Sequence, residues 1–339
     1  MKTLRKEYFN PFFSHIYVEK GIRNHARVQA ILAKFPHAEV IEIGHYKDVF
    51  CRSRQNYRLQ HHTQKLILAA RQGTLLYEGA PVCQSFGNRY FYYASCVMNC
   101  IFDCEYCYLK GMYPSANIVV FVNLEDIFAE AERILERHPL YLCVSYDTDL
   151  LALEQILGYV REWCDFVARH ENLKIEIRTK CANQSFIRNI TPSPGVIYAF
   201  TLSPQRVIEA FEHHTSSLAE RLSCAAELIG KGCPVRLCFD PMIYLPDWKQ
   251  CYEEMLKQVY DVIDFERIVD VSVGTFRISQ DYLKNMKKQE SESAVVWFPF
   301  QREKGYCHYP DALMEQMEAF LTESLETKIP REKIFRWKE

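Results

Sequence analysis

The stretch that decides the fold reads Cys96-Val-Met-Asn-Cys100-Ile-Phe-Asp-Cys104-Glu-Tyr-Cys107-Tyr108, with four cysteines within twelve positions. Cys100, Cys104 and Cys107 have the spacing C-x3-C-x2-C, and an aromatic residue stands on each side of the last one. Three thiolates can hold three irons of a [4Fe-4S] cluster and leave the fourth iron open for a ligand that is not protein. Cys96 cannot begin an equivalent triad, because Asp103 occupies the position that would complete its spacing.

Two other uses of clustered cysteines stay open at this point. A structural zinc site is usually built from paired cysteine knuckles, and this run contains a single C-x2-C pair, Cys104 and Cys107. A disulfide would require an oxidising compartment. Because the spacing of three cysteines matches the cluster pattern in full, we favour an iron–sulfur site.

The composition describes a chain that can bury a large core. Of its 339 residues 48% are hydrophobic, and the formal net charge is −2. This charge excludes a globally basic nucleic-acid-binding protein, so any contact with DNA must come from a local patch. No run of about 18 apolar residues occurs, and the residues after Met1 lack the apolar segment of a signal peptide. We therefore predict no membrane span, no membrane partner and a cytoplasmic location.

The order of strand-like and helix-like segments predicts an α/β fold. From residue 89 onward the two alternate about every 35 to 40 residues, as in a parallel sheet with helical crossovers. The expected strands are 90–94, 141–146, 174–178, 196–201, 235–239 and 268–273. Six such units make a partial (β/α)6 barrel of the TIM type. The cysteine run follows the first strand, and ligand chemistry in parallel sheets collects at the carboxyl ends of strands.

We predict three regions along the chain. Residues 1–88 form an N-terminal α/β region, 89–276 the partial barrel, and 277–339 a C-terminal section that binds substrate or DNA. Within the last section, 294–300 is strand-like and 312–325 is an amphipathic terminal helix.

The cysteine spacing with its flanking tyrosines resembles the radical S-adenosylmethionine (SAM) superfamily. In that superfamily the amino and carboxylate groups of SAM chelate the open iron, and an electron from the cluster cleaves SAM to give a 5′-deoxyadenosyl radical. The resemblance implies a [4Fe-4S] cluster and SAM as cofactors. It also implies an electron donor such as flavodoxin or ferredoxin.

Over nearly its whole length the chain resembles, more narrowly, the spore photoproduct lyase family, which repairs DNA by reverting a thymine photoproduct. The matching segments are Gln55-Asn-Tyr-Arg58, Cys104-Glu-Tyr-Cys-Tyr-Leu109, Phe121-Val-Asn-Leu-Glu-Asp-Ile127, Arg178-Thr-Lys180 and Pro241-Met-Ile-Tyr244. The resemblance implies a radical SAM lyase whose partner is DNA containing a thymine photoproduct.

Carried over position by position, the resemblance also implies roles for single residues. Cys100, Cys104 and Cys107 would be the cluster ligands. Ser145, Thr201 and Ser203 would bind the SAM cofactor, although the family typically has Ser and Asn at the last two positions. The residues with implied catalytic roles, near the active site or in radical transfer, are Tyr106, Tyr108 and Lys180.

The chain departs from the family where a cysteine is expected to return a hydrogen atom to the product radical. The family segment Ser-Cys-Thr-Ser-Asp reads Ser145-Tyr-Asp-Thr-Asp149 here, so Tyr146 stands in the place of the cysteine. Tyr146 could donate the hydrogen atom itself, with Tyr106 or Tyr108 completing a relay. Cys143 is the alternative, but an odd offset along a strand points it to the opposite face.

Extrusion of a lesion from duplex DNA requires phosphate contacts and an apolar wedge at the mouth of the site. The family has a DNA-binding hairpin in the C-terminal section. The basic residues at that place are Lys284, Lys287, Lys288, Arg302 and Lys304, with acidic residues interspersed as on an ordinary charged surface.

Two other functions remain open on the same sequence. A paralogous radical SAM enzyme could act on another nucleic acid or on a small molecule. A nucleic-acid-binding iron–sulfur protein could have lost turnover.

Overall fold

A twisted, mostly parallel sheet forms the centre of the protein. The structure, a computed structural model, describes residues 13–80, 83–290 and 292–336. The central sheet has eight strands in the order β18-β14-β13-β11-β10-β9-β5-β4. Its six inner strands run parallel to one another, which confirms the α/β fold with a partial barrel. These strands are β5 (Phe91–Ala94), β9 (Leu140–Cys143), β10 (Leu173–Thr179), β11 (Val196–Thr201), β13 (Val235–Met242) and β14 (Asp270–Thr275).

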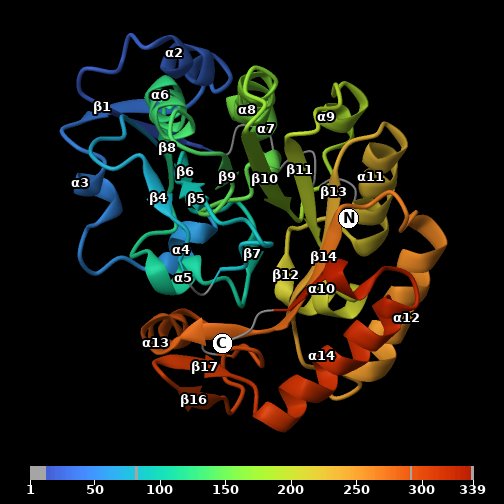
Figure 1. The fold of residues 1–339 in the computed structure, drawn as a ribbon. Coiled ribbons are helices and arrows are strands. Elements are labelled where there is room, and N and C mark those ends of the chain that lie inside the picture. The colour runs from blue at the N-terminus through green and yellow to red at the C-terminus, as the bar shows by residue number, and fades with distance from the viewer. Residues whose placement is uncertain (1–12, 81–82, 291, 337–339) are drawn as a thin grey trace.

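Strands β4 (Leu76–Glu78) and β18 (Ile334–Arg336) extend this sheet at its two edges. Helices range along the outer side of the sheet and connect its strands (Figure 1). They are α6 (Leu124–Leu135), α7 (Glu154–Leu157), α8 (Tyr159–Val167), α9 (Gln184–Arg188), α10 (Gln205–Phe211), α11 (Leu218–Gly230), α12 (Trp248–Val262) and α14 (Asp311–Glu326). Short 3-10 turns cover Leu151–Leu153 and Arg331–Lys333.

A buried ionic cluster lies near the amino-terminal ends of these strands. The Arg236 guanidinium pairs with the carboxylates of Glu176 and Asp270 and lies 3.2 Å from the ring centroid of Phe86. Tyr141 donates a hydrogen bond to Glu176 at 2.5 Å. Buried charges are tolerated only when paired in this way, so the cluster fills this end of the barrel and leaves the carboxyl end for ligands.

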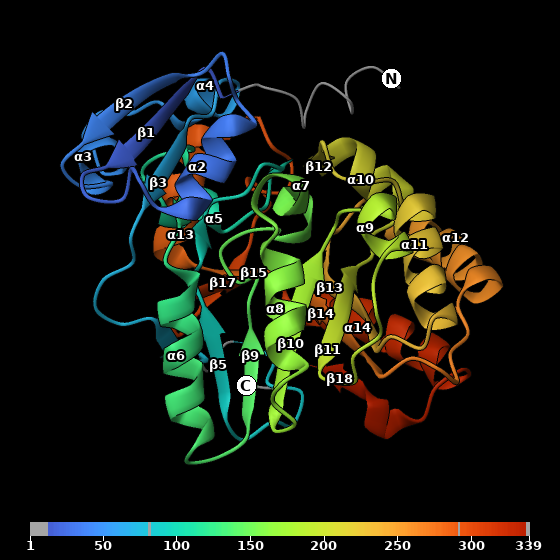
Figure 2. The same cartoon turned by 90° about the horizontal axis from the view of Figure 1, so that it is seen from above.

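A second sheet belongs to the N-terminal part of the molecule (Figure 2). Its order is β2-β1-β3-β8-β6. Its first two strands in chain order are β1 (His15–Glu19) and β2 (Glu39–Ile43), which are connected by α2 (Ala26–Ala33). The other members are β3 (Leu66–Ala69), β6 (Val97–Met98) and β8 (Ile118–Phe121), so residues on both sides of position 88 share this sheet.

The C-terminal section packs onto the loop side of the barrel. It contains α13 (Gln280–Gln289) and the three-stranded sheet β15-β17-β16. Its strands are β15 (Arg277–Ser279), β16 (Gln301–Glu303) and β17 (Tyr306–His308). Helix α13 approaches α5 (Leu109–Met112) so closely that a Cβ on Gly111 would meet the Tyr282 carbonyl oxygen at 2.5 Å, so this contact requires glycine.

The prediction of a strand at 294–300 is wrong. These residues form turns, in which the Trp297 amide donates to the Ser293 carbonyl at 3.0 Å and Pro299 offers no amide hydrogen. Val295 and Val296 are nevertheless buried, because they pack into the protein interior from a turn and not from a strand. No helix among the described residues is both long and apolar enough to cross a membrane.

Candidate active site

The cysteine run forms a loop at the carboxyl end of the barrel strands. Asn99 starts it with a left-handed backbone (φ 71°), and its side-chain amide donates to the Ser115 and Asn117 carbonyls at 2.6 and 2.9 Å. Asparagine tolerates this conformation better than most residues. The short strand β7 (Asp103–Cys104) then pairs with β12 (Glu212–His213), which ties the loop to the segment after β11.

The three predicted ligands gather on this loop. Cys104 is buried and Cys100 and Cys107 are half-buried, and all three thiols are free. Burial raises the pKa of each thiol, and the charges of the neighbouring thiols raise it further for Cys100 and Cys104. The three cysteines lie within eight positions of one loop, so their charges act on one another. An added positive group, such as a metal cluster, would offset this penalty.

A single metal ion and an iron–sulfur cluster require different arrangements of the three thiols. Among the described residues, no three Cys, His, Asp or Glu side chains converge as the ligands of one metal ion do. In a [4Fe-4S] cluster each cysteine instead binds a different iron, so the sulfurs stand farther apart. Three free thiols on one loop are therefore a donor set that fits the cluster.

The buried carboxylate of Glu212 connects several side chains around the cysteine loop. Glu212 accepts hydrogen bonds from Tyr106 and, at 2.7 Å, from Ser203, and pairs with Arg221, whose side chain is fully buried. Burial alone would raise the pKa of Glu212, but the charges of Arg221 and Lys180 lower this pKa to about 2. Neither Glu212 nor Arg221 belongs to a motif in the sequence, so sequence analysis missed both.

Lys180 points from the end of β10 toward the cysteine loop. Its ammonium nitrogen lies 3.9 Å from the Cys104 sulfur, 3.8 Å from a Glu212 oxygen and 4.7 Å from the ring centroid of Tyr106. A cation at this place stabilises a thiolate at Cys104. The structure thus brings together Lys180, Tyr106 and Cys104 as the sequence implied.

The residues expected to bind SAM lie at the ends of the barrel strands. The Ser145 hydroxyl accepts from the Arg178 amide at 2.7 Å, and the Thr201 carbonyl accepts from Arg221 at 2.9 Å. Ser203 belongs to the Glu212 network. All three are buried, and their role toward SAM stays a prediction.

Tyr146 lies in the loop that follows β9, because that strand ends at Cys143. Its ring stacks on Tyr93 with centroids 4.2 Å apart and lies 6.0 Å from Tyr108, whose hydroxyl donates to the Tyr146 carbonyl. Tyr108, then, is the neighbour of Tyr146, while Tyr106 is directed to Glu212.

A thiol contacts the Tyr146 hydroxyl. The Cys83 sulfur lies 3.4 Å from this oxygen. Burial raises the pKa of Cys83, which keeps the group a neutral S–H. Cys143, the alternative considered from the sequence, is buried in β9. Cys83 lies in a segment without periodicity, so the sequence held no signal that could have singled it out.

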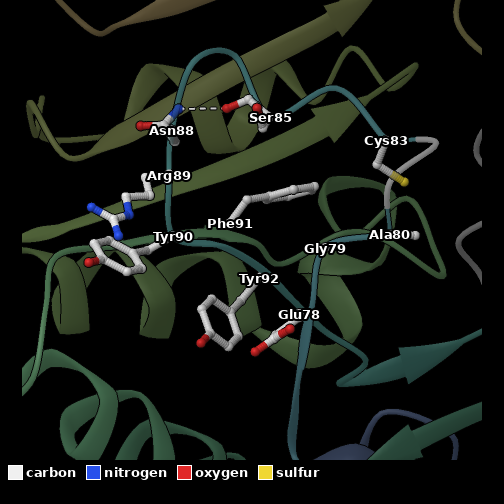
Figure 3. A pocket seen from close by; sticks show the side chains of 10 residues that line it. All are labelled: Glu78, Gly79, Ala80, Cys83, Ser85, Asn88, Arg89, Tyr90, Phe91 and Tyr92. Carbon is white, nitrogen blue, oxygen red and sulfur yellow. Dashed lines mark hydrogen bonds between the residues drawn. The ribbon is translucent and has the colours of Figure 1, made fainter. Parts of the chain in front are cut away.

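A cavity of about 410 Å³ opens beside Cys83, along the segment that connects β4 to β5 (Figure 3). Its lining includes Cys83, Ser85, Arg89 and Phe91. The Phe91 ring extends into the middle of the view, and Cys83 stands at the rim. The cavity lining includes neither Tyr146 nor any residue of the cysteine loop.

Comparison with known proteins assigns the family. The family model described as spore photoproduct lyase matches residues 55–337. The chain belongs to the spore photoproduct lyase family. Radical SAM chemistry with a [4Fe-4S] cluster and SAM characterises this family, so the resemblance and both cofactors inferred from the sequence are confirmed at the level of the family.

Curated relatives of this chain are named spore photoproduct lyase. The chain is 29% identical over 171 residues to spore photoproduct lyase of Clostridium acetobutylicum, covering 49% of this chain and 50% of the relative. It is 20% identical over 259 residues to that of Bacillus subtilis, with 74% of each chain covered. The matched part thus spans about half the length of the more similar relative.

Solved structures of spore photoproduct lyase show the same fold. One, complexed with dinucleoside spore photoproduct, superimposes with a TM-score of 0.79 at 16% identity, covering 96% of this chain and 99% of the other. A mutant of the enzyme also gives 0.79, with 95% and 97% covered.

The basic residues predicted to bind DNA lie on two neighbouring elements of this family fold. Lys284, Lys287 and Lys288 belong to α13. Arg302 and Lys304 belong to the hairpin of β16 and β17, whose Lys304-Gly305 turn has positive φ at both residues, as in a type I′ turn. The hairpin expected in this section is thus present.

Two exposed aromatic side chains accompany these basic residues. Trp297 is 52% exposed, and the Lys287 ammonium lies 4.7 Å from its ring centroid. Tyr306, on the hairpin, is 38% exposed. Sequence analysis missed both, although an aromatic residue within a basic segment is the signal for base stacking.

Proposed function

We propose that this chain is a radical SAM lyase that reverts a thymine photoproduct in DNA. The observation that carries the proposal is the loop of three free cysteines, with Lys180 against Cys104, at the carboxyl ends of the barrel strands. Cys100, Cys104 and Cys107 would hold the cluster, with Ser145, Thr201 and Ser203 toward SAM. When bound, these cofactors supply the radical that removes a hydrogen atom from the lesion.

The chain itself must then return a hydrogen atom to the product. Tyr146 occupies the place of the family's donor cysteine, and its hydroxyl contacts the Cys83 sulfur. In the proposal, Tyr146 gives its O–H hydrogen to the product radical and Cys83 gives its S–H hydrogen to Tyr146. One hydrogen atom leaves the lesion and one returns, so the lesion itself is neither oxidised nor reduced. The thiyl radical left at Cys83 is returned to S–H by one further electron from the electron donor and a proton from water.

DNA would be held by the C-terminal section. A damaged dinucleotide resists extrusion less than a paired one, and it needs a stacking partner once outside the duplex. Lys287 and Arg302 offer phosphate contacts beside the exposed rings of Trp297 and Tyr306. The proposal includes a small electron donor such as flavodoxin or ferredoxin and a cytoplasmic location, where cysteines stay reduced.

The test uses synthetic dinucleoside spore photoproduct and the full chain, reconstituted with iron and sulfide without oxygen and given SAM and dithionite. We expect release of the repaired dithymidine product, measured by chromatography, and none from the Cys104→Ala variant. Formation of 5′-deoxyadenosine without repair would show an enzyme with another substrate. Absence of 5′-deoxyadenosine would show a protein without turnover.

A further inference from the structure

One of the segments that resemble the family, Gln55 to Arg58, has no part in the proposed chemistry. It forms the start of helix α4 (Tyr57–His61). The Asn56 side chain caps this helix by accepting from the Leu59 amide at 3.0 Å. The Gln55 amide donates to the carbonyls of Phe50 and Arg52 at 2.8 and 2.9 Å. The segment is therefore held in a defined conformation.

The inner face of α4 packs on the cysteine loop. Tyr57 is buried, and its pKa is raised well above its ordinary value by burial and by the charges of Cys107, Asp103 and Cys100. The His61 ring lies 3.8 Å from Asp103, and three residues beyond the helix end the Gln64 amide donates to the Cys100 carbonyl at 3.0 Å. One helix thickness, about 10 Å, therefore separates the loop from the solvent face of α4.

The outer face of α4 is basic with an apolar centre. Leu59 is 65% exposed, and Arg58 beside it is exposed as well. Arg52 and Arg54, just before the helix, are also exposed and form no ion pair with any described residue. Figure 2 shows α4 at the outer edge of the molecule, beside the N-terminal sheet.

Positive charge is concentrated in this segment, although the chain as a whole has a slightly negative net charge. Between residues 45 and 65 the only acidic residue is Asp48. The basic residues of that stretch are Lys47, Arg52, Arg54, Arg58 and Lys65, in a chain whose net charge is −2. Local charge of one sign selects and steers a partner of the opposite sign.

We propose that the α4 surface, made of Arg52, Arg54, Arg58 and Leu59, is the docking site of an acidic one-electron carrier protein. The inference rests on the proposed function, because a [4Fe-4S] cluster that cleaves SAM must receive an electron from outside. The carrier loses one electron, and the cluster that the three cysteines would hold gains it. Arginine is among the side chains enriched in protein interfaces.

DNA is the competing partner for a basic surface, and two observations favour the carrier. The centre of the α4 surface is Leu59, which offers nothing to a phosphate backbone. The exposed aromatic rings that would stack bases, Trp297 and Tyr306, lie in the C-terminal section and not here.

The test compares two triple charge reversals in the full chain. One is Arg52→Glu with Arg54→Glu and Arg58→Glu. The matched control reverses three exposed lysines on or near α12 and α14, as Lys249→Glu with Lys257→Glu and Lys328→Glu. The probe is flavodoxin, an acidic flavoprotein. Its binding in the oxidised form is measured by calorimetry, and the bleaching of cluster absorbance by its reduced form is followed by stopped flow.

We expect the α4 reversal to weaken flavodoxin binding and to slow bleaching about ten-fold or more at low salt, as for steered protein pairs. Bleaching by dithionite, which needs no docking, should not change, and the control should behave as wild type. The proposal would be overturned if the α4 reversal left flavodoxin binding and bleaching unchanged. It would also be overturned if the reversal abolished DNA binding and left flavodoxin binding and bleaching intact. If dithionite fails to bleach the wild-type protein, the proposed function fails, while calorimetry still decides the docking site.

Discussion

The two ends of the candidate site are built differently. At the cysteine loop, the fully buried pair of Glu212 and Arg221, together with the half-buried Lys180, holds the geometry. At the proposed hydrogen-donor end, uncharged contacts hold Tyr146: the rings of Tyr93 and Tyr108, the Tyr108 hydroxyl on its carbonyl, and the sulfur of Cys83, which itself lines a cavity. Under the proposed function, the first end must place three sulfurs in one arrangement, whereas the second must bring one S–H hydrogen within reach. The proposal therefore expects the position of the donor to tolerate change more readily than the spacing of the cysteines.

The largest effect should come from breaking the buried pair at the cysteine loop. Arg221→Met leaves Glu212 buried without its main cation, and removal of one partner of such a pair typically costs about 3–5 kcal/mol. Urea unfolding should show this loss in the free energy of unfolding. Cys83→Ser at the other end should change the free energy of unfolding by less than about 1 kcal/mol. Equal losses at both ends would contradict the contrast.

Glu154 is a second buried carboxylate that can be compared with Glu212. Unlike Glu212, it has no partner cation that neutralises it. It accepts from the Val160 and Arg161 amides, but burial raises its pKa to about 7. A raised carboxyl pKa means that the folded state binds the proton more tightly. Its contribution to stability is therefore complete below about pH 4.5 and is lost as the pH rises to about 7.

Glu154→Gln removes this titration. Relative to wild type, the variant should gain up to about 3 kcal/mol in the free energy of unfolding between pH 4.5 and pH 8. Urea unfolding at a series of pH values measures the difference, and Glu209→Gln, at an exposed position on α10, serves as control. A difference that does not vary with pH would contradict the assigned cause.

The smallest effect should lie on the exposed C-terminal section, outside both ends. Lys287→Glu with Arg302→Glu should weaken DNA binding and reduce the slope of log affinity against log salt by about one per lost phosphate contact. Fluorescence anisotropy with a labelled duplex measures both. The pair Lys249→Glu and Lys257→Glu on the far helix α12 should leave the slope unchanged.

Much of this architecture could be predicted from the sequence. The six parallel strands follow from buried apolar runs between helical segments, and the cluster ligands from the spacing of Cys100, Cys104 and Cys107. Strand β8 escaped prediction because Ile118–Phe121 is a short, fully buried run whose partner β3 lies about fifty residues earlier. The strand expected at 294–300 failed because apolar residues were taken for a strand where they pack in turns.

The rest of the site depends on contacts between segments distant in sequence. Cys83 meets Tyr146 across 63 residues, and Tyr106 meets Glu212 across 106 residues. No periodicity or local spacing encodes such a meeting. The domain boundaries and the single-residue roles remain predictions for the same reason.

The most direct test of the account is to follow the hydrogen atom at Cys83. Wild type, Cys83→Ser and Cys143→Ser are incubated with dinucleoside spore photoproduct under the same anaerobic conditions. Repaired dithymidine and 5′-deoxyadenosine are measured in each. Serine has nearly the size of cysteine but holds its hydrogen too strongly to donate it to a phenoxyl radical. We predict that Cys83→Ser still forms 5′-deoxyadenosine but loses most repaired product, while Cys143→Ser repairs as wild type does. Full repair by Cys83→Ser would contradict the account.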